Sequence, residues 1–248
     1  MSENPMTSEK KRAFDTYDLT LESTELVTPR NKHLRFRLEG EKSLHFKAGQ
    51  FVQIFIPQGT SSPGRVRRTS YSIASSPSHR DYFELCVTLV DGGVSSAALH
   101  SLKVGDPIQA MGPLGAFVMK DEAADTVFIS TGSGVAPFRS MIHDRLEKNT
   151  PQKLYLLFGN RHEADIIYRK EWMDLSREKP NFQAMFTLSR ATWDGPRGYV
   201  QDKIQEFVPE AGKKEYYICG LVNMINAVQE KLLTLGVPKE KIHFERYD

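Results

Sequence analysis

The chain has 248 residues, 40% apolar and 26% charged, which is the composition of an ordinary globular protein with one or two domains. Its 33 basic and 31 acidic residues give a net charge of +2, so it lacks the basic character of a nucleic-acid-binding domain, and we expect no nucleic-acid partner. The two cysteines, Cys86 and Cys219, form no C-x-x-C pair, which excludes a four-cysteine zinc or iron–sulfur site within the chain. We therefore expect no bound metal and a reducing, cytoplasmic location.

The beginning of the chain is polar. Residues 1–13 contain no apolar stretch of the kind found in a secretory signal peptide, and we expect this segment to be mobile. No apolar run elsewhere approaches the length of a membrane span, so we expect no contact with a membrane.

The first half of the sequence predicts short β-strands. Residues 34–38, 51–56 and 83–90 are rich in apolar and β-branched residues, and clusters of Gly, Pro and Ser at 57–64 and 75–78 separate them. Short strands at this spacing favour an antiparallel sandwich or barrel, which we assign to residues 14–119.

The second half predicts alternating strands and helices. The apolar runs at 126–130, 154–158, 182–188 and 216–219 are separated by helical stretches. The last helix places Val222, Ile225, Val228, Leu232 and Leu235 on one face. This alternation indicates a parallel sheet covered by helices, which we assign to residues 120–248. The predicted fold class is therefore a two-domain β + α/β protein.

A glycine-rich loop follows the first predicted strand of the second domain. Thr131, Gly132, Gly134 and Pro137 lie between the strand at 126–130 and a helix. Glycines let the backbone approach a phosphate, and a helix N-terminus supplies N–H donors. A tight strand-to-helix turn explains the same residues, and the loop alone does not separate the two interpretations.

Short motifs elsewhere carry a resemblance. They comprise Arg68 to Ser75, Gly93 to Ser96, Thr131 to Arg139, Cys219 to Met224, and Glu245 to Tyr247. In this order they resemble the flavin segment R-x-Y-S, a pyrophosphate turn, T-G-x-G-x-A-P-x-R, C-G-x-x-x-M and the terminal E-x-Y of the ferredoxin–NADP(+) reductase family. The resemblance spans residues 68–247 and is closest to the plant-type branch. It implies an antiparallel FAD-binding barrel followed by a Rossmann-like NAD(P)-binding domain.

The resemblance assigns the flavin to the first domain. Tyr71 would flank the isoalloxazine or ribityl chain, and Ser72 would lie near flavin N5. Ser95 and Ser96 would open a short helix whose backbone N–H groups suit the pyrophosphate. The remaining implied FAD contacts are Arg68, Ser70, Cys86, Val87, Thr88, Gly93 and Val94.

One position departs from the family pattern. The family usually has an arginine two residues before the tyrosine, where this chain has Thr69 and places Arg68 one residue earlier. A one-residue shift in a strand turns the side chain to the opposite face. Either a bulge restores Arg68, or Arg67 or Arg65 binds the flavin phosphate instead.

The resemblance places hydride transfer at the end of the chain. Cys219 would touch the nicotinamide C4 region, Glu245 would act as a proton relay, and Tyr247 would stack on the flavin. With Ser72, these are the expected catalytic residues. Asp248 extends the chain one residue past the usual plant-type ending.

The coenzyme would be held by the glycine loop and by two further segments. The further contacts implied are Gly220, Leu221, Met224, Ser189, Arg190, Arg197, Tyr199 and Gln201. Ser189, Arg190 and Tyr199 resemble the plant-type residues that hold the adenosine 2′-phosphate, so the resemblance implies NADPH, with NADH the less favoured coenzyme. A dianionic phosphate favours such a guanidinium with hydroxyl donors.

The implied enzyme is a ferredoxin–NADP(+) reductase-like flavoprotein. It would exchange electrons between NADP(H) and ferredoxin, flavodoxin or another small electron carrier, and we expect a monomer. The alternatives are the NAD(P)H reductase component of an oxygenase system and a non-catalytic electron-transfer subunit.

Overall fold

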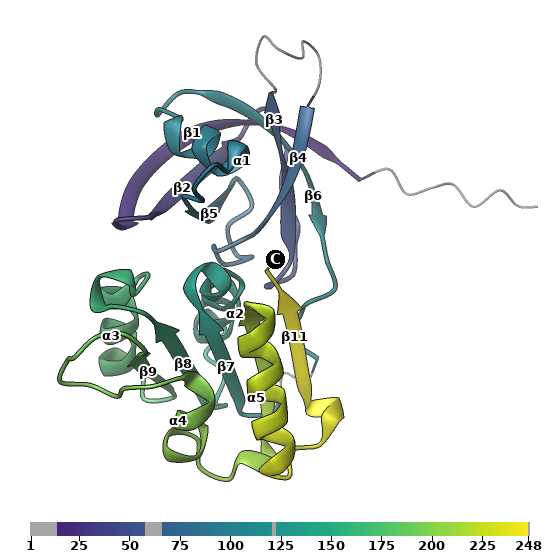
Figure 1. The fold of residues 1–248 in the computed structure, drawn as a ribbon. Coiled ribbons are helices and arrows are strands. Elements are labelled where there is room, and N and C mark those ends of the chain that lie inside the picture. Colours follow the sequence, from purple (N-terminus) through teal and green to yellow (C-terminus); the bar gives the residue numbers. More distant parts are fainter. Residues whose placement is uncertain (1–13, 58–65, 121–122, 248) are drawn as a thin grey trace, which may run out of the picture.

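The computed structural model describes residues 14–57, 66–120 and 123–247. Two sheets divide the molecule into an upper β domain and a lower α/β domain, and the C-terminal strand of the lower sheet ends where the two domains meet (Figure 1). The predicted mobile segment 1–13 and most of the predicted loop 57–64 lie outside the described residues.

The first domain is built on a six-stranded antiparallel sheet with the order β4-β3-β6-β1-β2-β5. Its strands are β1 (Thr16–Thr28), β2 (Asn31–Leu38), β3 (Phe51–Pro57), β4 (Val66–Ser72), β5 (Tyr82–Thr88) and β6 (Pro107–Leu114). A bridge between Ile73 and Leu85 joins the two ends of the sheet and closes the barrel. Alternate residues such as Val52, Ile54 and Phe36 fill its interior and are fully buried. The predicted antiparallel barrel is confirmed.

A short helix crosses the barrel after β5. Helix α1 (Val94–Ser101) begins at the turn around Gly93, close to the predicted start at Ser96. Leu99 on this helix is buried in the barrel core, which fixes the helix against the sheet.

The second domain contains a five-stranded parallel sheet with the order β11-β10-β7-β8-β9. The strands are β7 (Thr126–Thr131), β8 (Leu154–Asn160), β9 (Phe182–Leu188), β10 (Glu215–Gly220) and β11 (Ile242–Arg246). The helices are α2 (Val135–Glu147), α3 (Arg169–Glu178), α4 (Val200–Phe207) and α5 (Val222–Thr234), with 3-10 turns at Gly132–Gly134, Glu163–Asp165, Ala211–Lys213 and Lys239–Lys241.

Helices cover both faces of the parallel sheet, as predicted. Helices α2 and α3 bury Phe138 and Trp172 on one face, while α4 and α5 bury Ile204, Ile225 and Val228 on the other. The Rossmann-like arrangement is therefore confirmed. Strand β11 is an addition, because the sequence pattern marked residues 245–247 as a motif without predicting a strand.

The two domains share an apolar core. Ala48, Ala74 and Phe117 from the first domain belong to the same buried cluster as Phe138 and Met141 of helix α2. Gly49 shows how close the approach is, since a Cβ atom there would lie 2.1 Å from the carbonyl oxygen of Phe117 and 2.3 Å from Met141 Cε. Among the helices of the described residues, none is long and apolar enough to cross a membrane.

Candidate flavin and nicotinamide site

The expected catalytic residues meet where the two domains face each other. Ser72 ends strand β4 of the barrel, while Cys219 and Glu245 are neighbours in the parallel register of β10 and β11. Tyr247 joins the two domains, because its hydroxyl donates a hydrogen bond to Ser72 Oγ and its backbone N–H donates to the carbonyl of Gly220 at 3.1 Å. Residues separated by 175 positions in the sequence thus form one cluster.

Burial controls the protonation of this cluster. It raises the pKa of Glu245 to about 7, so this carboxyl group can hold or release a proton near neutral pH. Burial, and then the nearby Glu245, raise the pKa of the Cys219 thiol well above its ordinary value, so Cys219 stays protonated. Burial also raises the pKa of the Tyr247 phenol, which keeps its O–H available as a donor. Glu245 is the group in this cluster suited to proton exchange.

Strand β4 divides the flavin segment between two faces. In its pairing with β3, Tyr71 lies opposite Val52 and Thr69 lies opposite Ile54, so both share the face of these buried residues. Tyr71 is half-buried, and burial raises its pKa to about 12, so the ring is a neutral, partly covered surface. Such a ring suits the apolar edge of a flavin.

The same register shows which of the described arginines shares a face of β4 with Tyr71. Over the described residues of β3 and β4 no bulge interrupts the pairing, so Arg68 lies opposite Phe55, with its guanidinium 4.9 Å from that ring. Arg68 therefore faces away from Tyr71, together with Ser70, which lies opposite Gln53. Arg67 lies on the Tyr71 face, and Arg65 lies outside the described residues.

The predicted pyrophosphate turn lies beside Thr69. The hydroxyls of Thr69 and Ser95 are 2.7 Å apart, which ties strand β4 to the first turn of α1. Ser96 Oγ accepts a hydrogen bond from the Val90 backbone and donates one to the Gly93 carbonyl, so it shapes the turn. A Cβ atom at Gly93 would lie 2.8 Å from Ser96 Oγ. The turn presents helix N–H groups beside a hydroxyl pair, which fits a pyrophosphate.

Strand β5 supplies the remaining predicted flavin residues. The Cys86 side chain faces the core shared by the domains, Val87 faces the barrel core, and burial raises the pKa of the Cys86 thiol to about 12. The Val87 carbonyl lies 2.9 Å from His100 Nε2, and the Thr88 hydroxyl accepts a 2.6 Å hydrogen bond from Asn31. These side chains are engaged within the protein. Val94, next to them, is 54% exposed.

The glycine loop packs directly against the end of β10. A Cβ atom at Gly134 would lie 2.4 Å from the Cys219 carbonyl oxygen, and one at Gly220 would lie 2.6 Å from Thr131 Oγ1. Gly132 has a φ of +55°, which favours glycine, and Pro137 lies in the first turn of α2, where its missing N–H has no cost. The close approach of loop and strand is thus one reason for these glycines.

Unpartnered polar atoms mark the same edge of the sheet. Ser130 Oγ, Thr131 Oγ1 and Asn160 Nδ2 are buried and have no hydrogen-bond partner among the described residues. They lie at the carboxyl ends of β7 and β8, next to β10, where the strand order reverses. Ligands of open α/β sheets bind at this position, and buried polar atoms without partners favour a polar ligand. These residues fit a pyridine dinucleotide.

The predicted 2′-phosphate residues gather beyond β9. Leu188 bridges to Arg197, and the backbone N–H groups of Ser189 and Arg190 donate to the carbonyls of Asn160 and Arg161. Ser189, Arg190, Arg197 and Tyr199 are exposed, and Gln201 is half-buried on α4. Neither arginine forms an ion pair within the part of the chain that the structure describes. Arg197 Nη2 donates to the Trp193 carbonyl at 3.2 Å, which leaves its other N–H groups and the exposed Arg190 guanidinium for an anion.

Leu221 and Met224 complete the nicotinamide side. Leu221 is 60% exposed at the start of α5, and a Cβ atom at Gly220 would lie 2.8 Å from Met224 Cε. Asp248, the expected extra residue, lies outside the described residues.

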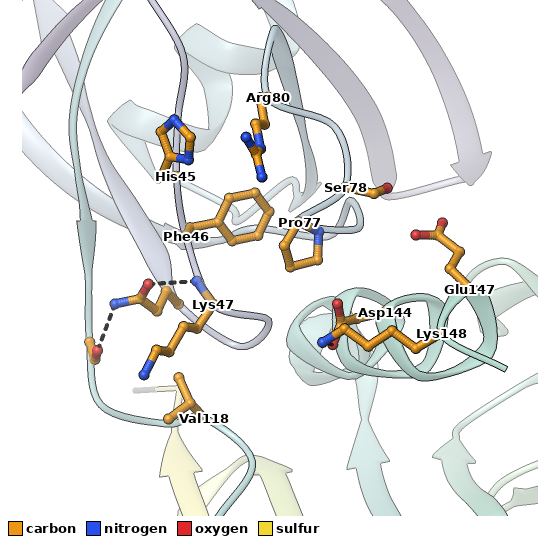
Figure 2. A pocket seen from close by; sticks show the side chains of 12 residues that line it. His45, Phe46, Lys47, Pro77, Ser78, Arg80, Val118, Asp144, Glu147 and Lys148 are labelled. Carbon is orange, nitrogen blue, oxygen red and sulfur yellow. Dashed lines mark hydrogen bonds and ion pairs between the residues drawn. The ribbon is translucent and has the colours of Figure 1, made fainter. Parts of the chain in front are cut away.

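A separate cavity lies away from this cluster. It measures about 850 Å³ and opens between the barrel segments 45–50 and 77–80 and the C-terminal end of α2 (Figure 2). Its walls carry Lys47 and Arg80 from the barrel, Asp144 from α2 and Lys148 just after that helix. None of the predicted catalytic residues lines it.

Sequence reasoning missed Asn160 and Arg139. Asn160 follows an apolar run and Gly159 but belongs to no motif, and the signal that singles it out is its buried, unpartnered amide nitrogen at the carboxyl end of β8. Arg139 closes the motif that begins at Thr131, but its contacts with the barrel depend on tertiary structure.

Comparison with known proteins agrees with this geometry. The oxidoreductase FAD-binding domain model matches residues 18–119, and the oxidoreductase NAD-binding domain model matches residues 128–230. Ferredoxin--NADP reductase B of Sorangium cellulosum is 38% identical over 244 residues, covering 94% of this chain and 98% of that protein.

Two further similar proteins are longer than the part that matches this chain. The reductase component DmpP of phenol 2-monooxygenase from Pseudomonas sp. is 32% identical, and the match covers 89% of this chain but 62% of that protein. The cytochrome P450 reductase GcoB of Amycolatopsis superposes with a TM-score of 0.83 at 26% identity, covering 94% of this chain and 71% of that chain.

The fold, the two cofactor-binding domains and these similarities define a class of FAD- and NAD(P)-dependent oxidoreductases. Within that class, the chain belongs to the ferredoxin–NADP reductase family. The predicted cofactors, FAD and a nicotinamide dinucleotide, are those of the matched domains.

Proposed function

We propose that the chain is an NADPH-dependent flavoenzyme that exchanges electrons between NADP(H) and a small one-electron carrier, ferredoxin or flavodoxin. The observation that carries the proposal is the cluster of Ser72, Cys219, Glu245 and Tyr247 at the junction of the two domains. Similarity to the Sorangium ferredoxin--NADP reductase over nearly the whole of both chains supports the choice of carrier.

The bound flavin would supply the conversion of a two-electron hydride into single electrons, which no side chain can perform. The chain's own residues would bind and orient. Tyr71 would cover one side of the flavin ring, and the α1 turn with Arg67 would hold its phosphates. Arg67 replaces Arg68 in this role because it shares the Tyr71 face of β4.

Tyr247 would act as a gate to the nicotinamide. In the structure the Tyr247 hydroxyl donates a hydrogen bond to Ser72 Oγ. The tyrosine ring must therefore move before the Ser72 hydroxyl can bind another partner. Cys219, neutral and buried, would give the nicotinamide a small contact surface without adding charge. Glu245 would take up or release the proton that accompanies electron transfer.

The preference for NADPH rests on the exposed arginines. Arg190 and Arg197 lie beside the Ser189 hydroxyl and face solvent without carboxylate partners among the described residues, an arrangement suited to a 2′-phosphate.

A second candidate is the reductase component of an oxygenase, favoured by the similarity to DmpP. In both candidates electrons leave the flavin singly, but the acceptor differs. The two cysteines exclude a four-cysteine iron–sulfur cluster within these 248 residues, so in either case the one-electron carrier would lie outside them.

The test begins with the purified protein. We expect a yellow preparation whose extracted flavin is FAD, rapid bleaching by NADPH, and reduction of an added ferredoxin or flavodoxin. FMN in the extract, or reduced protein that passes electrons to neither carrier, would contradict the proposal.

A further inference from the structure

Helix α2 links the nicotinamide loop to the flavin domain. Its N-terminus continues from the glycine loop at Gly132–Gly134, and its second turn carries Arg139. At 1.5 Å per residue, Arg139 lies about 7.5 Å along the helix from Gly134. A contact that fixes Arg139 therefore also fixes the loop.

Arg139 is held by both domains at once. Its Nη1 donates to Glu84 Oε2 at 2.7 Å and to the Ala74 carbonyl at 3.0 Å, both in the barrel domain. Its Nε donates to Glu171 Oε1 and Oε2 at 2.8 and 3.1 Å, on helix α3 of the second domain. The planar guanidinium thus spans the domain boundary with its separate nitrogens.

The surroundings keep these charges in place. The side chain of Glu84 is 6% exposed and that of Arg139 is 15% exposed. Burial opposes ionisation of Glu84, but the neighbouring His33 ring and the hydrogen-bonded Arg139 guanidinium outweigh it and hold the pKa of Glu84 below its usual value. Arg35 binds the other oxygen of Glu84 at 2.6 Å. Glu84 is consequently a charged anchor inside the barrel domain.

Tyr168 and His143 of the second domain add further contacts around Arg139 and Glu171. Tyr168 lies under the Arg139 guanidinium, 4.8 Å from ring centroid to Cζ, and its hydroxyl is 2.8 Å from His33 Nδ1 in the barrel. His143 on α2 contacts Glu171 at 2.6 Å, which orients the carboxylate toward Arg139. Each domain therefore contributes a carboxylate to one arginine.

We propose that Arg139 is a positioning residue for hydride transfer: through Glu84 it holds the dinucleotide-binding loop at the distance from the flavin that the reaction needs. The proposal rests on the proposed function, because it requires nicotinamide and flavin to react across this boundary. Hydride transfer needs near-contact geometry, and a displacement of about 1 Å can lower a rate by roughly 100-fold.

Arg139→Lys is the direct test. A lysine keeps the charge, but its three donors share one nitrogen, so it cannot reproduce the contacts that Arg139 makes through two separate nitrogens, Nε to Glu171 and Nη1 to Glu84 and Ala74. We expect flavin reduction at saturating NADPH to slow by about 10- to 100-fold. FAD content and the Kd for NADP⁺ should remain within about twofold, since Arg139 touches neither the α1 turn nor the segment around Arg190.

Two variants serve as partner and control. Glu84→Gln should reproduce the slow reduction, and combining it with Arg139→Lys should add little, because both remove the same link. Glu147→Ala is the matched control, since it removes the 2.5 Å hydrogen bond that Ser76 of the barrel donates to the carboxylate at the C-terminal end of α2. It should change the rate by no more than about twofold, because Glu147 is exposed and lies at the end of α2 away from the glycine loop.

The readouts separate positioning from stability. A lower rate with unchanged NADP⁺ affinity and weaker long-wavelength absorbance of the stacked nicotinamide and flavin supports the proposal. Wild-type rates in both Arg139→Lys and Glu84→Gln would overturn it, and so would a rate loss that simply parallels loss of FAD.

Failure of the proposed function gives a different result. In that case neither NADPH nor NADH reduces the flavin of the unmutated protein. The contact between Arg139 and Glu84 is then tested by calorimetry. Glu84→Gln should split the thermal unfolding of the FAD-loaded protein into two transitions, one for each domain. A single unchanged transition would overturn the role of Arg139 in joining the domains.

Discussion

Tyr247→Ser should tighten nicotinamide binding. The ring of Tyr247 packs against the shared core, and its hydroxyl binds Ser72, so removal of the ring opens the surface that the nicotinamide needs. Loss of aromatic packing removes about 0.5–1.5 kcal/mol, and loss of the hydrogen bond removes a further 0.5–1.5 kcal/mol or so. The competition therefore weakens by about 1–3 kcal/mol, which corresponds to roughly 5- to 150-fold in affinity.

The increase in affinity should be the same for both coenzymes. Nicotinamide binding is common to NADPH and NADH, whereas the 2′-phosphate contact is not, so discrimination between them should fall and product release should slow. Tyr247→Phe is the control, because it keeps the ring and loses only the hydrogen bond to Ser72. Its affinity for the coenzyme should rise by no more than about tenfold.

The assay is titration of the oxidised protein with NADP⁺ by difference absorbance, followed by stopped-flow reduction with each coenzyme. Unchanged affinity and unchanged coenzyme preference in Tyr247→Ser would show that the tyrosine does not compete with the nicotinamide. The interpretation of the C-terminal segment as a gate would then be wrong.

Other predictions follow from neighbouring parts of the site. Arg190→Ala should raise the KM for NADPH by about tenfold or more and leave NADH nearly unaffected, as expected for loss of a charge-assisted contact of about 1.5–3 kcal/mol; steady-state kinetics with both coenzymes decide this. Arg67→Ala should weaken FAD retention by about tenfold while Arg68→Ala changes it little, measured by flavin release during dialysis; the reverse order would contradict the assignment from the β4 register. Burial raises the pKa of Glu245 from 4.5 to about 7, so the folded state binds the proton more tightly and stability falls as pH rises from about 4.5 to 7. Glu245→Gln should therefore gain stability relative to the unmutated protein at pH 8 but not at pH 4.5, as measured by urea unfolding of the flavin-free proteins, and equal differences at both pH values would contradict the assignment. The same substitution should lower turnover with less effect on coenzyme affinity.

Local sequence patterns were sufficient for the fold class. The alternation in residues 34–38 and 51–56 reflects strands with one face in the barrel core, and the stripe from Val222 to Leu235 reflects a helix with Ile225, Val228 and Leu232 buried. These patterns arise from burial on one face, which leaves a periodic trace in the sequence. Strand β11 left a weaker trace because it is short and lies at the edge of the sheet.

The site was only partly visible in the sequence. Motifs marked Ser72, Cys219, Glu245 and Tyr247, but their meeting depends on how the domains pack, which no local pattern encodes. The side of strand β4 on which Arg67 and Arg68 lie could be known only from the pairing of β4 with β3, because a register shift of one residue exchanges the two faces. The link from Arg139 to Glu84 joins residues 55 positions apart in different domains, and neither residue type is distinctive alone.

The most direct measurement is anaerobic stopped-flow absorbance of the purified FAD-loaded protein mixed with NADPH or NADH, followed by addition of oxidised ferredoxin or flavodoxin. Rapid flavin bleaching, an efficiency with NADPH at least about tenfold above that with NADH, and recovery of the flavin absorbance as the carrier is reduced would agree with the structure. A flavin that neither coenzyme bleaches would contradict the assignment of the Ser72, Cys219, Glu245 and Tyr247 cluster as the site of hydride transfer.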